Sequence, residues 1–195
     1  MNRRIIQAVV LVSFWSLLLL ACKKSDPAPL GAQTNAVFLA GQTGKSKSWK
    51  LRELTYQYGT QAAVTQTLPG CFADNLYTFT NNATQDYAAT EGASKCYNSD
   101  AIENGTWAFS LDGLTLTIEV SNTQSPNGLF TPEPDFAVGD TTNIKYFSQL
   151  SIYPYNIGYP YPAFVKKIDD NNLVLEMNYK VGSTTYKYTM TFTPA

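Results

Sequence analysis

The strongest constraint on the fold is an alternation of apolar and polar side chains that recurs from about residue 45 to the C-terminus. The clearest run closes the chain, where Tyr186, Tyr188, Met190 and Phe192 alternate with threonines and a lysine. Because successive side chains of a β-strand point to opposite faces, this period of two predicts strands with one buried face. Long segments with helical periodicity are absent from this region, which favours an all-β domain.

Turn-forming residues divide the alternating region into short strands. Asp112-Gly113 is typical of a tight hairpin, and the run 169–172, Asp-Asp-Asn-Asn, is typical of a turn. A change of phase near Glu53 predicts a β-bulge in the first strand. The predicted strands cover about residues 48–58, 77–81, 85–90, 106–111, 113–120, 143–153, 163–168, 173–181 and 185–192.

In the two strands around Asp112-Gly113, the alternation predicts which side chains face inward. Trp107, Phe109 and Leu111 share one face of the first strand. The second strand places four aliphatic side chains together, those of Leu114, Leu116, Ile118 and Val120. We therefore expect these residues, like Trp49, to belong to the core.

Eight or nine antiparallel strands joined by hairpins predict a single antiparallel β-barrel. Closing a sheet on itself removes its exposed edges, and an eight-stranded barrel encloses either packed side chains or one small ligand. A two-sheet β-sandwich is the alternative, because alternation alone does not distinguish the two architectures.

The first 22 residues follow a different pattern. Arg3 and Arg4 precede an apolar run that ends at Leu20, and the small Ala21 then precedes Cys22. This order is typical of a secretory signal sequence, and the run is short for a membrane span. Leu-Leu-Ala-Cys resembles the lipobox of bacterial lipoproteins, which implies cleavage before Cys22 and its acylation. A plain secreted protein is the alternative. Several acyl chains form a durable membrane anchor.

Removal of residues 1–21 from the 195 leaves 174, enough for one domain and a tail. We predict that residues 22–44 are the acylated cysteine and a flexible tether, because residues 23–36 hold two prolines and no apolar period. Within this segment, residues 37–39 predict a short helical turn that closes one end of the fold. Residues 45–195 then form the barrel domain.

Residue counts exclude several classes of function. The chain has no histidine, which removes the commonest general base and metal ligand, and its scattered charges sum to −1, which disfavours nucleic acid as a partner. We expect no enzyme, no cofactor and no metal site. With Cys22 assigned to lipid, Cys71 and Cys96 remain, and export favours a disulfide between them over two free thiols.

The ordered motifs of the domain are similar to those of the lipocalin-like lipoproteins of the Bacteroidota. The resemblance implies a calyx-like barrel with a disulfide and with Trp49 at its closed base. In proteobacteria an Asp directly after the acylated cysteine favours the inner membrane, so Lys23 in that place favours the outer membrane. The matching motifs are Ser48-Trp49-Lys50-Leu51, Cys71-Phe72-Ala73-Asp74-Asn75-Leu76-Tyr77-Thr78-Phe79, Glu91-Gly92, Cys96, Gly105-Thr106-Trp107, Leu114-Thr115-Leu116, Asn172-Leu173-Val174-Leu175 and Tyr188-Thr189-Met190-Thr191-Phe192.

Two further segments carry candidate functional residues. The loop 153–162 is rich in proline and tyrosine, and its aromatic faces suit stacking on sugars or apolar ligands; packing on the barrel rim is the alternative. Asp140-Thr141-Thr142 resembles the O-glycosylation motif of the Bacteroidota, which implies a glycan on Thr141. The candidate ligand-binding residues of the loop are Tyr153, Tyr155, Tyr159 and Tyr161.

These observations predict a non-catalytic, lipid-anchored protein of the cell envelope. Its barrel is expected to bind a small hydrophobic or sugar-like ligand. The alternative is a structural lipoprotein with a packed barrel, which contacts envelope partners through its long loops.

Overall fold

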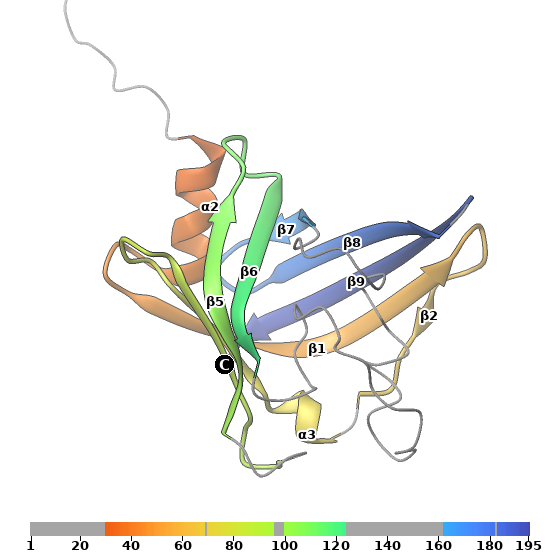
Figure 1. Ribbon diagram of the computed structural model, residues 1–195, viewed down its shortest axis with the longest axis horizontal. Helices are drawn as coiled ribbons and strands as arrows, with labels where there is room; N and C mark the ends of the chain where they lie inside the picture. Colours follow the sequence, from red (N-terminus) through yellow and green to blue (C-terminus); the bar gives the residue numbers. More distant parts are fainter. Residues whose placement is uncertain (1–29, 69, 96–99, 124–161, 182) are drawn as a thin grey trace, which may run out of the picture.

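The computed structural model describes residues 30–68, 70–95, 100–123, 162–181 and 183–195 (Figure 1). These residues form one antiparallel sheet and two helices. Neither of these helices is long and apolar enough to cross a membrane. The elements are α2 (Gly31–Ala40), β1 (Ser46–Tyr58), β2 (Val64–Thr65), α3 (Gly70–Ala73), β3 (Leu76–Thr80), β4 (Asp86–Thr90), β5 (Ala101–Phe109), β6 (Thr115–Thr123), β7 (Ala163–Ile168), β8 (Leu173–Val181) and β9 (Thr184–Pro194).

The sheet closes on itself. Its strand order is β2-β1-β3-β4-β5-β6-β7-β8-β9, and β1 also pairs with β9 from Trp49↔Pro194 to Tyr58↔Tyr186. β2 pairs with β1 alone, so the other eight described strands form the ring. One closed antiparallel sheet confirms the predicted all-β fold of eight or nine strands, and the two-sheet sandwich is not formed.

Bulges let this sheet curl. The register of β1 against β9 shifts between Leu51 and Glu53, where the change of sequence phase predicts it. Further shifts occur where the pairing skips Ile102 of β5, Ser121 of β6 and Lys166 of β7. A bulge bends its strand and increases the local twist, which a sheet needs in order to close into a ring.

The alternating residues supply the interior of the ring. In β8 and β9 the predicted inward side chains are all buried where the structure describes them, and each large apolar side chain removed from water contributes about 1.5–3 kcal/mol. Aromatic edges pack against one another among them, as between Tyr77 and Phe192 at 5.6 Å. The buried residues of these two strands are Leu173, Leu175, Met177, Tyr188, Met190 and Phe192.

The prediction for the ends of β5 and β6 is wrong at two leucines. Leu111 is 76% exposed and Leu114 is 62% exposed, because β5 ends at Phe109 and β6 begins at Thr115. The five residues between them form the turn rather than continuing the strands. Asp112 organises this turn by accepting hydrogen bonds from the Ser110 hydroxyl and the Leu114 backbone, which also lower the pKa of its carboxyl.

The tether predicted for residues 22–44 is wrong from Gly31 onward. Residues 31–40 form α2, which lies beside β5 at one end of the ring (Figure 1). Leu39 and Ala40 at its C-terminal end are fully buried, and Ala32 donates a backbone hydrogen bond to the Leu111 carbonyl. The helix therefore belongs to the domain, and the expectation that residues 37–39 close one end of the fold holds.

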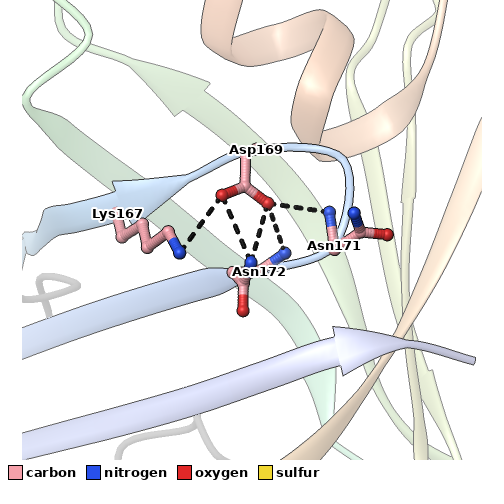
Figure 2. A network of polar contacts seen from close by, with 4 residues as sticks. All are labelled: Lys167, Asp169, Asn171 and Asn172. Atoms are coloured by element: carbon pink, nitrogen blue, oxygen red, sulfur yellow. Dashed lines mark hydrogen bonds and ion pairs between the residues drawn. The ribbon is translucent and has the colours of Figure 1, made fainter.

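The turn between β7 and β8 confirms the prediction for residues 169–172. Asp169 Oδ1 accepts hydrogen bonds from the backbone amides of Asn171 and Asn172 and from the Asn172 side chain (Figure 2). Lys167 lies 3.3 Å from the other carboxylate oxygen. These contacts hold the pKa of Asp169 at about 2. Both oxygens of its carboxylate are engaged by these contacts within the turn.

Candidate functional site

One end of the ring is closed by α2 and the first residues of β1. The fully buried Trp49 donates from Nε1 to the Leu39 carbonyl at 2.8 Å. Lys47 Nζ lies 4.3 Å from the centroid of the Trp49 ring and donates to the carbonyls of Phe38 and Asp170. Partial burial lowers the pKa of Lys47. Trp49 therefore occupies the closed base that the family resemblance implies.

A group of polar side chains lies inside the ring on β3, β4 and β5, where Tyr77 pairs directly with the base residue Trp49 of β1. We define this polar cluster as Asn75, Tyr77, Tyr87, Glu91 and Glu103. Each is at most 7% exposed. Figure 1 shows α3, which leads into β3, at the opposite end of β5 from α2. Asn75 follows α3 by two residues, so this member of the cluster lies near α3.

Strand register brings the cluster together. Tyr77 of β3 pairs with Ala89 of β4, and Ala89 pairs in turn with Glu103 of β5. Continuing the β3–β4 register places Asn75 opposite Glu91. Neighbouring strands are about 4.8 Å apart, so Tyr77 and Glu103 flank Ala89 at about 10 Å between their backbones. The small side chain of Ala89 leaves the space between them for their longer side chains.

A short hydrogen bond fixes one side of the cluster. The Tyr87 hydroxyl donates to Glu103 Oε1 at 2.6 Å, and both side chains are buried. The Tyr87 ring is held in turn by Phe79, whose ring centroid is 5.1 Å away. A hydrogen bond to a carboxylate is stronger than one between neutral groups, which makes Tyr87 and Glu103 a rigid pair.

The other side of the cluster has polar atoms without hydrogen-bond partners. Asn75 is fully buried, and both its Oδ1 and its Nδ2 lack a partner. The Tyr77 hydroxyl lacks one as well. Each such atom costs about 1–3 kcal/mol relative to its hydration in the unfolded chain. Three of them at one place, in a ring otherwise lined by apolar side chains, are typical of a site that a ligand or ordered water completes.

Two carboxylates, those of Glu91 and Glu103, affect the electrostatics of the cluster. Burial raises the pKa of the Tyr77 hydroxyl, the charge of Glu103 raises it further, and the nearby Asn75 side chain lowers it. Tyr77 is therefore a neutral group that can donate or accept a hydrogen bond. Glu91 and Glu103 are buried, and each makes an interaction within the fold. The described residues contain no group of three or more potential metal ligands.

Most of the sequence-predicted site residues lie outside the described residues, and their roles stay predictions. These are Cys22, Cys96, Thr141, Tyr153, Tyr155, Tyr159 and Tyr161. Cys71 is described: it lies half-buried in α3 against the core, and its sulfur is not a free thiol. The predicted pairing of Cys71 with Cys96 stays a prediction.

Sequence reasoning missed the polar cluster although it placed several of its neighbours correctly. The parity that turns Tyr77 and Phe79 inward also turns Asn75 inward, and the same holds for Glu91 after Tyr87 and Ala89 on β4. Glu103 could not be predicted as an inward-facing residue, because Ile102 and Glu103 are both buried and the pairing with β4 skips Ile102. A bulge at that point breaks the alternation on which the strand prediction depends.

The fold and this site together define a class of protein, a closed antiparallel ring whose interior holds a buried polar cluster. Residues 46–131 match the family model of the lipocalin-like domain, which supports the resemblance noted from the sequence motifs. The match spans β1 to β6 and contains all five residues of the polar cluster.

More distant comparisons add little. A solved lipocalin-like protein from Bacteroides uniformis ATCC 8492 is 14% identical to this chain, with a TM-score of 0.33, over 77% of this chain and 96% of that one. A likeness at this level adds nothing to the fold described above. No curated protein matches the chain.

Proposed function

We propose that this protein is a non-catalytic binding module that holds a small hydrophobic ligand inside its ring. The lipocalin-like domain supports this class of function. The observation that carries the proposal is the set of unpartnered polar atoms on Asn75 and Tyr77, which lie fully buried among apolar side chains. A ligand with an apolar body and one polar end satisfies both kinds of surface.

A test of the binding function uses the full-length protein purified from its own membranes. Native mass spectrometry of the wild type is expected to detect a bound small molecule, and Asn75→Leu is expected to lose it. The matched control is Val64→Thr, which changes an exposed residue of β2, outside the ring, and should keep the ligand. A wild type without any bound molecule, which also takes up no added amphiphile, contradicts the proposal and favours a packed barrel that serves as a structural protein.

The second part of the proposal is an acyl anchor on Cys22 that holds the module at the outer membrane. It rests on the order of basic, apolar and small residues before Cys22. With α2 beginning at Gly31, eight residues separate Cys22 from the domain, a reach of at most roughly 26–29 Å. The ring is thereby kept close to the lipid surface.

Radioactive palmitate tests this anchor. The wild type should incorporate label and sediment with outer-membrane vesicles, whereas Cys22→Ala should do neither. Incorporation of the same amount of label by Cys22→Ala contradicts acylation at this residue. The same purified protein tests the Cys71–Cys96 disulfide, by peptide mapping without reductant, and the Thr141 glycan, by intact mass.

A further inference from the structure

Four large apolar side chains are exposed where the start of α2 meets the β5–β6 hairpin and β7. We define this apolar patch as Leu30, Leu111, Leu114 and Phe164, each of which is at least 41% exposed. Single apolar residues on a surface are ordinary, whereas several that lie together are typical of a surface that binds a partner or a membrane. The interior of the ring does not use these side chains.

Backbone contacts place the start of α2 against the hairpin. Ala32 donates a hydrogen bond to the Leu111 carbonyl at 3.3 Å, and the Asn35 side chain donates to the Gly113 carbonyl at 2.9 Å. Leu30, the residue directly before α2, therefore lies beside the tip of the hairpin. Figure 1 shows the start of α2 and this hairpin together, with β2 far from both.

The other side of the hairpin lies against β7. Val165 donates a backbone hydrogen bond to the Leu114 carbonyl at 2.9 Å, and Phe164 pairs with Thr115. Phe164 is thereby the neighbour of Leu114 on the adjacent strand. The four residues of the apolar patch come from three separate segments of the chain and form one exposed surface.

We propose that the apolar patch docks on the lipid surface of the membrane to which Cys22 anchors the domain. The proposal rests on the acyl anchor proposed above and adds to it the face that the domain turns toward the membrane. The chain from Cys22 enters the domain at Leu30, which is itself part of the patch. Eight residues separate Cys22 from α2, so the patch lies within roughly 26–29 Å of the acylated residue.

The chemistry of the hairpin fits the boundary between head groups and acyl chains. Asp112 lies between the two leucines of the hairpin, and its exposed carboxylate accepts hydrogen bonds from the Ser110 hydroxyl and the Leu114 backbone amide. A carboxylate stays hydrated at the level of the head groups, while neighbouring leucines reach the acyl boundary and leave water. Because Asp112 would be repelled by anionic lipids, the occupant is a zwitterionic lipid surface.

Tryptophan quenching tests this contact. The protein purified from its own membranes is reconstituted on phosphatidylcholine vesicles with and without bromine on the acyl chains, since bromine quenches tryptophan only at close range. The added tryptophan of Leu111→Trp should lose most of its emission in the brominated vesicles. Val64→Trp is the matched control, because Val64 is exposed on β2, far from the apolar patch, and its added tryptophan should keep its emission. The buried Trp49 and Trp107 give the same background in both variants.

The possible outcomes separate the docking surface from the anchor. Vesicle-bound Leu111→Trp protein with equal emission in both kinds of vesicle overturns the proposal and leaves the anchor intact, and Leu114→Trp repeats the test at a second position. A wild type that does not sediment with the vesicles contradicts both. Sedimentation velocity in detergent tests a second copy of the chain as the occupant: a wild-type dimer that Leu111→Ser abolishes also overturns docking on lipid.

Discussion

Asn75 and Tyr77 lower the stability of the protein when nothing is bound. Their buried atoms lose hydration on folding and regain no hydrogen bond, whereas Tyr87 regains one with Glu103. Residues arranged this way leave polar atoms open for a ligand, but they lower the stability of the unliganded protein. The two tyrosines therefore differ in what their hydroxyls do, although both are inward-facing aromatic residues on neighbouring strands.

The contrast between these tyrosines predicts opposite effects of the same substitution. Tyr77→Phe should leave the stability of the unliganded protein unchanged or raise it by about 1 kcal/mol, because an unpartnered hydroxyl is removed. Tyr87→Phe should lower it by about 1–3 kcal/mol, because Glu103 loses its donor while buried. Urea denaturation of both variants measures the difference. A loss of stability in Tyr77→Phe equal to that in Tyr87→Phe would mean that the Tyr77 hydroxyl has a partner after all.

Asp169 contributes to the stability of the folded protein in a way that depends on pH. Its pKa is about 2 in the folded protein against an ordinary 3.8, so the folded state favours the charged form. A depressed pKa contributes stability above pH 3.8, and this contribution is lost as the pH falls toward 2. Asp169→Ala should therefore be less stable than the wild type at neutral pH, and the gap should close in acid. Thermal melts across this pH range check it; a gap that does not change with pH contradicts the role of the charge.

At the scale of elements, α2 depends on the hairpin between β5 and β6. Gly31 and Gly113 lie so close that a Cβ on Gly113 would be 2.6 Å from the Gly31 carbonyl carbon. Asn35 adds a hydrogen bond from its side-chain amide to the Gly113 carbonyl at 2.9 Å. α2 has no side-chain cap at its N-terminus. Contacts with the ring thus stabilise this helix more than its own sequence does.

A glycine pair isolates the packing of α2. Gly113 and Gly44 have similar left-handed backbones, with φ of 76° and 79°, but nothing lies within 4 Å of a Cβ built on Gly44. Gly44→Ala should cost about 1–2 kcal/mol from backbone strain alone. Gly113→Ala should cost more, because it must also displace α2, and hydrogen exchange in residues 31–40 should quicken. Equal costs in the two variants would show that the hairpin does not hold the helix.

The elements that the sequence predicted best are those in which one face is wholly apolar. β8 and β9 follow the alternation throughout their described side chains, so burial and pattern agree. Of α2, only a helical turn at residues 37–39 was predicted, because its residues show no apolar stripe and its helix depends on the hairpin at Gly113. β2 was not predicted, because two residues carry no periodicity.

The polar cluster was hidden from sequence analysis for a related reason. A buried carboxylate such as Glu103 is read as a solvent-facing residue by any rule that equates polar with exposed. The strand that carries it was accordingly predicted to begin at Thr106, five residues after its true start at Ala101. The alternation rule predicts that polar residues face solvent. It therefore fails at a site where polar side chains are buried inside the ring for a function.

For the molecule as a whole, the pairing of β1 with β9 converts a sheet into a ring and encloses the polar cluster. This seam joins the two ends of the domain, with residues such as Thr55 and Thr189 paired across it. β2 pairs two residues with β1 and takes no part in closing the ring. Closure should therefore be cooperative with the whole fold, whereas the pairing of β2 should be dispensable.

Proline substitutions on the two sides of β1 separate these contributions. Thr189 pairs with β1 on one side and β8 on the other, and Thr189→Pro should abolish cooperative folding or lower the melting temperature strongly, because proline is not tolerated in a strand paired on both sides. Val64→Pro affects a two-residue edge strand and should shift the melting temperature little. Differential scanning calorimetry gives both values. Because an open ring exposes the polar cluster to water, Thr189→Pro should also lose the small molecule that the wild type holds, while Val64→Pro keeps it. A stable Thr189→Pro protein that still holds this molecule would show that ligand binding does not require the closed seam.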